Sequence, residues 1–253
     1  DDDGRYTKHI KKFEGIHIFK ADQIVIENLK ECKKLLSNGK LTHSYPHSWR
    51  SKAPLVHRAT SQWFISMEER DLRKKALKAI DDTDFYPERG RDRIRSMIET
   101  RPDWCVSRQR IWGVPLPLFV SKKTKEPLKD SEVIENIAKI FEKEGADCWF
   151  TDDPQKFLGK KYKKEDYIKS SDIVEVWFDS GATHSYVLEK RKDLAWPASM
   201  YLEGSDQHRG WFHSSLLESC GTRGKAPFKS ILTHGFVVDG KGLKMSKSVG
   251  NII

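Results

Sequence analysis

The stretch that decides the fold runs Tyr201-Leu202-Glu203-Gly204-Ser205-Asp206-Gln207-His208-Arg209-Gly210-Trp211. Residues 200–203 have the composition of a short strand, and Ser205 or Asp206 can cap a helix through Cys220. A further apolar run at 231–233 predicts another strand. Strands that alternate with helices in this way are typical of a parallel α/β sheet.

Polar side chains gather where the predicted strands end. A third strand is predicted over residues 171–178, which are largely apolar. The polar residues at or just after the three strand ends are Asp179, Glu203 to Gln207 and His234. Ligands of parallel sheets lie beyond the carboxyl ends of the strands, so we expect these residues to surround a ligand.

A basic loop follows, with its centre at Lys244-Met245-Ser246-Lys247-Ser248 and glycines on both sides. Ammonium and hydroxyl groups on such a loop suit a polyphosphate that gains charge during a reaction. The run 235–242 nearly matches a P-loop, but its eighth position is Gly242 instead of the Ser or Thr that holds Mg²⁺. Residues 236–239 instead predict a strand that leads into an Asp-Gly hairpin turn.

The first 170 residues predict a series of short elements. They are short strands within 1–20, a helix from Asp22 to about Ser37, a loop over 43–54, a strand over 59–65, a helix opened by the capping box Ser66–Glu69, a helix over 92–100, an apolar strand over 104–120 and a helix over 132–144. The last helix lies in a charged insertion.

Composition narrows the class of protein. The 253 residues suffice for one or two domains, and the net charge of +9 favours a polyanionic partner. No apolar run approaches the roughly 18 residues of a membrane span. The four cysteines are widely separated, which predicts free thiols in a reducing cytosol. His43 and His47 have no further ligands near them in sequence, so structural histidines are the simpler interpretation.

Four motifs stand in one order along the second half of the chain: Trp177 to Gly181, Glu203 to Phe212, Thr233 to Phe236 and Lys244 to Asn251. Together they resemble the isoleucyl-tRNA synthetases of the bacterial type, which are class I aminoacyl-tRNA synthetases. The stretches 43–47, 62–64 and 101–113 agree, so the resemblance covers essentially the whole chain. It implies an α/β fold: the second half of a Rossmann-like nucleotide-binding core, preceded by the C-terminal part of a mixed α/β editing insertion.

The resemblance also implies domain limits. The expected parts are 1–100 for the end of the editing insertion, 101–120 for the return strand into the catalytic core, 121–170 for a small connective insertion, and 171–253 for the second half of the core.

A role for each matching residue follows from the resemblance. Lys247 would stabilise departing pyrophosphate, helped by Lys244. The implied contacts to the adenylate or ATP are Glu203, Gly204, Asp206, Gln207, His234, Gly235, Ser246 and Lys247. Trp177 and Trp211 resemble the aromatic walls of the isoleucine side-chain pocket.

Two departures from the family pattern set further expectations. Some relatives carry Cys-x-x-Cys where this chain has Ser48 and Ser51, so we predict no zinc. The family's His-Ile-Gly-His signature, which binds ATP, is absent, as are the editing motifs that precede this region. The chain is therefore expected to be the middle of the enzyme and to form no isoleucyl-adenylate by itself.

The expected function is ATP-dependent ligation of isoleucine to tRNA(Ile) by way of isoleucyl-adenylate, with Mg²⁺-bound ATP as substrate. The expected partners are tRNA(Ile), isoleucine, ATP and the rest of a monomeric, cytoplasmic synthetase without a membrane anchor. Two alternatives stay open: a valyl- or leucyl-tRNA synthetase relative, and a non-catalytic basic RNA-binding fragment that keeps relict motifs.

Overall fold

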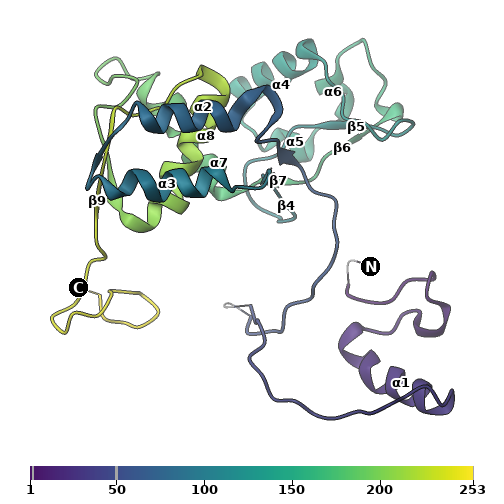
Figure 1. Cartoon of the computed structure of the whole chain (residues 1–253). Helices are drawn as coiled ribbons and strands as arrows, with labels where there is room; N and C mark the ends of the chain where they lie inside the picture. The colour runs from purple at the N-terminus through teal and green to yellow at the C-terminus, as the bar shows by residue number, and fades with distance from the viewer. Residues whose placement is uncertain (2, 49–50, 253) are drawn as a thin grey trace. The chain divides into compact units, whose positions relative to one another are not determined.

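The computed structural model describes residues 1, 3–48 and 51–252 (Figure 1). The chain forms two compact units, Asp1–Ser61 and Gln62–Ile253. This division differs from the expected domain limit near residue 100, because residues 62–100 share a hydrophobic core with residues 201–231. No helix in the described ranges is long and apolar enough to cross a membrane.

Among its described residues, the first unit contains one long helix, α1 (Ile18–Glu31), after a 3-10 turn, η1 (Lys11–Phe13). The predicted cap at Asp22 is wrong: the ring of His17 accepts the N–H of Phe19 and starts the helix earlier. The predicted end near Ser37 is also wrong. Lys33 adopts φ +55°, and the N–H of Lys34 bonds to the carbonyl of Leu29, which closes the helix in a Schellman motif.

Outside α1 the first unit has little regular structure. The strands predicted within residues 1–20 reduce to one antiparallel bridge between Arg5 and His17. The predicted loop over 43–54 is confirmed in its described residues, where His47 and Pro54 form another isolated bridge.

The second unit is built on a three-stranded parallel sheet, which confirms the predicted parallel α/β architecture. Its strands are β2 (Asp84–Tyr86), β9 (Ser230–His234) and β8 (Tyr201–Gly204), in that order. The strands predicted at 200–203 and 231–233 are therefore correct. Each strand places one buried side chain in the core: Phe85, Ile231 and Tyr201, respectively.

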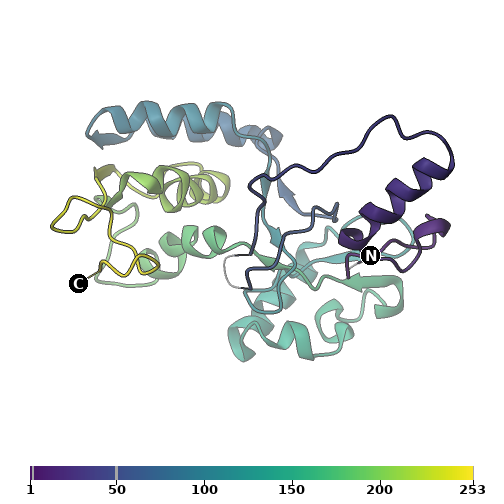
Figure 2. The same ribbon diagram turned by 90° about the horizontal axis from the view of Figure 1, so that it is seen from below.

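Three helices cover the core: α2 (Leu72–Asp81), α3 (Arg89–Glu99) and α8 (Trp211–Arg223). α2 packs on both α3 and α8, and α7 (Val176–Gly181) packs on α8 (Figure 1). Seen from below, α8 lies between α7 and the pair formed by α2 and α3 (Figure 2). α8 is consequently buried over most of its length, including Phe212, Leu216 and Cys220.

Short antiparallel pairs connect the sheet to the rest of the unit. They are β1 (Phe64–Ile65) with β3 (Trp104–Cys105), and β4 (Ser107–Arg108) with β7 (Ile173–Val174). The strand predicted over 171–178 is wrong beyond Val174. Because the carboxylate of Glu175 accepts the N–H of Trp177, the chain turns into α7 there. A π-helical turn, η4 (His184–Leu188), follows.

The predicted charged insertion forms a small helical module with its own core. It contains α4 (Ser131–Glu144), α5 (Cys148–Thr151), α6 (Pro154–Leu158), η3 (Lys164–Asp166) and the antiparallel pair β5 (Phe119–Ser121) and β6 (Tyr167–Lys169). The predicted helix over 132–144 is confirmed. Asp130 caps its start, and Val133 and Ile137 face the core around Trp149 and Phe157.

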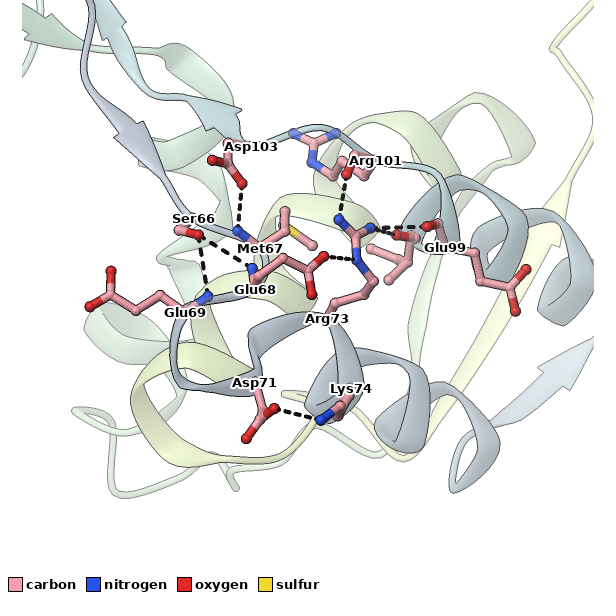
Figure 3. A network of polar contacts seen from close by, with 11 residues as sticks. Ser66, Met67, Glu68, Glu69, Asp71, Arg73, Lys74, Glu99, Arg101 and Asp103 are labelled. Atoms are coloured by element: carbon pink, nitrogen blue, oxygen red, sulfur yellow. Dashed lines mark hydrogen bonds and ion pairs between the residues drawn. The ribbon is translucent and has the colours of Figure 1, made fainter.

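Arginine side chains join α2 to α3, and Figure 3 shows Arg73 among them. The guanidinium of Arg73 donates to the carbonyls of Ile98, Glu99 and Arg101 at the end of α3, and pairs with Glu68 at 2.6 Å. One half of the predicted capping box is confirmed: the hydroxyl of Ser66 accepts the N–H groups of Glu68 and Glu69 at 3.3 and 3.2 Å. These residues precede a 3-10 turn, η2 (Glu69–Asp71), which leads into α2.

Candidate functional site

The carboxyl ends of β8 and β9 lie side by side. In the register of the parallel pair, Glu203 faces Thr233 and Gly204 faces His234. Glu203 and His234 are both exposed, as a site for a ligand requires. Asp179 was expected at a third strand end, but it lies inside α7. Burial and the neighbouring Glu175 raise the pKa of the Asp179 carboxyl.

Gly204 makes the turn out of β8 possible. A Cβ at this position would lie 2.7 Å from Oδ1 of Asp206 and 3.8 Å from Cε1 of His234. The carboxylate of Asp206 therefore rests against the end of β8 in the space that a side chain would fill. Only glycine allows a backbone and a carboxylate to approach this closely here.

Gln207 holds the start of α8. The predicted cap by Ser205 or Asp206 is wrong, because residues Ser205–Arg209 form a 3-10 turn, η5, and α8 begins at Trp211. The amide oxygen of Gln207 instead accepts the N–H of Trp211 at 2.9 Å, and its amide nitrogen donates to Asp206 at 3.4 Å. The side chains of Asp206 and Gln207 are thus brought together beside the end of β8, and their contact with a ligand stays a prediction.

The two predicted pocket tryptophans lie close to one glycine. A Cβ on Gly210 would come within 3.0 Å of the Trp177 ring, and Trp211 is the next residue. Trp211 stacks on Tyr201 with ring centroids 4.0 Å apart and planes 4° apart, and its indole N–H donates to the carbonyl of Ser180 at 3.0 Å. Trp177 is 40% exposed, so its ring is available to a ligand.

Tyr201 was not predicted as a site residue, but its ring stacks on Trp211 and supports it. Its ring is 3% exposed and its hydroxyl bonds to Ser215 at 3.1 Å. Burial raises the pKa of Tyr201 to about 12, so the hydroxyl stays protonated. The signal was its place as an aromatic residue at the start of β8, where its ring is buried in the core next to the helix that follows.

A pocket of about 390 Å³ opens beside the strand ends. Its lining residues come from the start of α3, the turn after β8 and the end of β9: Pro87, Arg89, Gly90, Arg93, Ser205, His208, Thr233, His234 and Gly235. Two arginines and the first N–H groups of an 11-residue helix favour an anionic group here. Arg89 and Arg93 were not predicted as site residues, because the sequence pattern places the start of this helix at residue 92.

His208 forms the floor of this pocket. It is 1% exposed, and its Nδ1 donates to the carbonyl of Ser205 at 2.7 Å, which leaves Nε2 as an acceptor. Within the described ranges Nε2 has no hydrogen-bond partner. Burial lowers the pKa of His208, so the ring is neutral near pH 7.

The basic loop is closed by its own side chains. Asp239 accepts the N–H groups of Lys241 and Leu243 through Oδ1 at 2.9 and 3.0 Å, and the amide of Asn251 through Oδ2 at 2.8 Å. Asn251 in turn accepts the N–H of Ser246 at 2.9 Å. These hydrogen bonds lower the pKa of Asp239. Figure 1 shows this yellow segment extending away from the sheet.

The expected hairpin at this loop is present in short form. The strand predicted over 236–239 reduces to one antiparallel bridge between Val238 and Lys244. The ammonium of Lys244 lies 3.5 Å from the centroid of the Phe236 ring, and the hydroxyls of Ser246 and Ser248 are 2.6 Å apart. Lys247 is exposed, and its side chain has no hydrogen bond or ion pair to any residue that the structure describes.

Among the residues described, no group of three or more His, Cys, Asp or Glu side chains could hold a metal ion. Nδ1 of His43 bonds to the carbonyl of Ser44 at 2.9 Å, and Nδ1 of His47 bonds to the carbonyl of Tyr45 at 2.8 Å. The absence of zinc stays a prediction based on Ser48 and Ser51.

Comparison with known proteins places these features in a family. The chain is 79% identical over 253 residues to the isoleucine–tRNA ligase of Pelagibacter ubique and 53% identical over 259 aligned positions to that of Syntrophotalea carbinolica. Both matches cover all of this chain and 28% of the relative, so the chain spans about a quarter of the length of its curated relatives.

A solved structure of Mycobacterium tuberculosis methionyl-tRNA synthetase bound by methionyl-adenylate matches 85% of this chain and 33% of its own, with 19% identity and a TM-score of 0.48. The family model described as tRNA synthetases class I (I, L, M and V) matches residues 9–253, which include the sheet, the pocket and the basic loop. The chain therefore belongs to the class I tRNA synthetases of the isoleucine, leucine, methionine and valine group.

Proposed function

We propose that this chain is part of an enzyme that ligates isoleucine to tRNA(Ile), using ATP and an isoleucyl-adenylate intermediate. The identity of 79% to an isoleucine–tRNA ligase over all 253 residues carries the proposal. The arrangement at the carboxyl ends of β8 and β9 supports it, because Glu203, Gly204 and His234 lie where parallel sheets bind nucleotides.

The strand ends would hold the adenylate. The exposed carboxylate of Glu203 would accept hydrogen bonds from the aminoacyl-adenylate, and Asp206 and Gln207 would accept or donate at its ribose and amino-acid end. Gly204 would let the ligand approach the backbone. His234 and Gly235, after β9, would lie towards the adenosine.

Trp177 and Trp211 would form walls for the isoleucine side chain. The hydrogen bond from Trp211 to Ser180 and its stacking on Tyr201 fix the orientation of one ring. A rigid aromatic wall suits a branched aliphatic side chain, because it offers apolar surface without losing rotamer freedom on binding.

The basic loop would act on the pyrophosphate of Mg²⁺-bound ATP. Lys247 would stabilise the charge that develops as the α-phosphate is attacked, and Lys244 and Ser246 would assist in holding the phosphates. The free ammonium of Lys247 suits the first role, whereas the contact of Lys244 with Phe236 restrains that residue in place.

The further parts of the proposal concern the parent protein. We place residues 1–61, a compact unit by themselves, in the editing insertion, and residues 121–170 in a connective insertion. The shared core of residues 62–100 and 201–231 supports a domain limit nearer residue 61 than residue 100. The net charge of +9 supports a tRNA partner, and we expect a monomeric, cytoplasmic parent.

A segment exchange tests the function. The matching segment of the Pelagibacter ubique ligase is replaced by this chain, and ATP–pyrophosphate exchange is measured with isoleucine, valine and leucine. We expect exchange with isoleucine at a rate near that of the parent ligase, and a preference over valine of roughly 10–200-fold, the range that one methylene provides.

The alternatives give different results in the same assay. Preference for valine or leucine would identify a relative with another specificity. A folded hybrid that exchanges with none of the three amino acids would favour the non-catalytic RNA-binding fragment and refute the proposal.

A further inference from the structure

A second pocket, of about 380 Å³, lies at the other end of α8 from the strand ends. Trp211 begins α8 and Gly221 lines this pocket, so the two are about 15 Å apart along the helix axis at 1.5 Å per residue. Its apolar walls come from β1, α2, β3, α7 and α8: Ile65, Leu72, Trp104, Phe178, Ala182 and Leu217. The proposed reaction uses none of these residues.

Two polar side chains in the wall have unused hydrogen-bonding atoms. His184 is 1% exposed, and neither of its ring nitrogens has a partner among the described residues. Oε1 of Glu218 is also buried without a partner in that part of the chain. Buried polar atoms are nearly always hydrogen-bonded, so two such groups beside one cavity favour a ligand that brings polar partners to them.

The charges around the pocket decide what that molecule can be. Burial, together with Asp179 and Glu175, raises the pKa of Glu218 to about 9. Burial and Arg223 lower the pKa of His184. Both groups are therefore neutral at pH 7, and the protonated carboxyl can donate a hydrogen bond.

The one cation in the wall is already paired. Arg223 bonds to both carboxylate oxygens of Glu189, at 2.9 and 2.8 Å, and to the hydroxyl of Ser185 at 3.0 Å. A charged ligand would find no free counter-charge among these residues and would lose its hydration on entry.

We propose that this pocket is a binding site for a small uncharged molecule with a flat apolar body and one amide or similar polar group. The apolar body would lie between Phe178, Trp104 and Leu217. The polar group would accept a hydrogen bond from the carboxyl of Glu218 and bond to the ring of His184.

Three probes of one shape and different charge test the proposal on the 253-residue chain. Benzamide, benzoate and benzylammonium are titrated at pH 7 while the indole N–H signal of Trp104 is followed by NMR. Benzamide is expected to bind saturably with a dissociation constant on the order of 10 mM or better, the value for about nine non-hydrogen atoms. The two ions are expected to bind at least tenfold more weakly.

Equal binding of the ions, or no saturable shift with benzamide, would overturn the proposal. A variant that fills the pocket provides a second test. Gly221→Leu adds a side chain at a lining position where a Cβ meets nothing closer than 3.7 Å. It should abolish the benzamide shift, whereas Ser96→Leu, an exposed position on α3, should leave it unchanged.

A pair of substitutions at Glu218 keeps the test decisive if Gly221→Leu does not fold. Glu218→Gln keeps a neutral donor and acceptor and should retain benzamide binding within about threefold. Glu218→Leu keeps apolar volume but no hydrogen bond and should weaken binding by about tenfold. Undiminished affinity in a folded Glu218→Leu or Gly221→Leu variant would show that benzamide binds elsewhere.

Discussion

The ammonium of Lys247 is exposed, whereas the ammonium of Lys244 rests on the Phe236 ring. In the hybrid ligase, we expect Lys247→Ala to slow adenylate formation by about 10²–10³, the cost of one preorganised group that stabilises developing charge. Isoleucine binding should change little, because the charge develops only in the transition state. Pre-steady-state adenylate formation at saturating ATP measures the effect.

Two neighbouring lysines provide the comparison. Lys244→Ala should slow the same step less, since its role would be mainly in binding phosphate. Lys241→Ala removes an exposed lysine of the same loop and should leave the rate unchanged. Equal effects of Lys247→Ala and Lys241→Ala would remove Lys247 from the mechanism.

Glu218 should make folding stability depend on pH. Its pKa is about 9 in the folded chain and about 4.3 when unfolded, so the folded state holds its proton more tightly. The stabilisation from the protonated group is complete below pH 4 and is lost as pH rises towards 9. Between these two pKa values, each unit of rising pH lowers the contribution of Glu218 to the free energy of unfolding by up to about 1.4 kcal/mol.

Glu218→Gln should therefore be more stable than the natural chain at pH 8, with a difference that shrinks towards pH 4.5. Urea midpoints across this range measure it. Burial lowers the pKa of His213 to about 3, so this residue makes the free energy of unfolding fall as pH drops below 6.5. Both chains contain His213, so its contribution cancels when their stabilities are compared. A difference that stays constant with pH would contradict the buried neutral carboxyl.

At the scale of elements, Gly181 sets the distance between α7 and α8. A Cβ here would lie 2.2 Å from Oε1 of Glu218 and 2.9 Å from Oγ of Ser214, both on α8. Gly181→Ala should lower the free energy of unfolding by about 1–3 kcal/mol, because the side chains of Glu218 and Ser214 must both shift to make room for the methyl group. Chemical denaturation measures this loss.

Gly221→Ala serves as the control for Gly181→Ala. Its Cβ would meet Leu72 at an ordinary 3.7 Å, so the better helix propensity of alanine should raise stability by up to about 1 kcal/mol. Similar losses in the two variants would mean that the close approach of α7 and α8 is unimportant.

Arg73 on α2 bonds to the end of α3 (Figure 3), while Arg91 and Arg95 on α3 bond to the end of α2. The side chain of Arg73 is 19% exposed and satisfies carbonyls at the end of α3. Arg73→Met should cost about 1.5–3 kcal/mol in the free energy of unfolding, the range for hydrogen bonds to a charged group. Lys74→Ala breaks an exposed pair with Asp71 on the same helix and should leave the urea midpoint unchanged.

Elements with a repeating pattern were predictable from the sequence, whereas elements fixed by a distant or single side chain were not. The helix over 132–144 carries Val133, Ile137 and a capping Asp130, so its pattern and its cap agree. The apolar residues from Ile173 to Trp177 also fit a strand. The carboxylate of Glu175, held by Trp104 at 2.8 Å, turns the chain into α7 instead.

The candidate site was likewise predictable where it depends on strand ends and not where it depends on long-range contacts. Glu203, Gly204 and His234 meet because strand ends of a parallel sheet share one edge. Arg89 and Arg93 reach that edge only because β2 pairs with β9, a long-range contact that no local pattern reports. Gln207 can cap α8 only because a 3-10 turn, η5, stands where the sequence predicts the first turn of that helix.

At the scale of the whole molecule, the main hydrophobic core lies between Met67 and Ile231, inside the second compact unit. We expect a chain without residues 1–61 to unfold at the same urea concentration as the full chain, because it keeps every residue of that core. Tryptophan fluorescence and circular dichroism measure the midpoint. A clear loss of stability would show that the first unit supports the second.

The mutual hydrogen bonds of Asp239 and Asn251 close the basic loop into a ring. A closed ring has fewer independent torsions than an open segment of equal length, so much of its conformational entropy is already lost in the free protein. If Lys244 and Lys247 act on a polyphosphate as proposed, they would reach it as two linked cations, and binding of one would set a high effective concentration for the other. The closed loop would then bind an anion that contacts both lysines more tightly than either lysine alone would bind it.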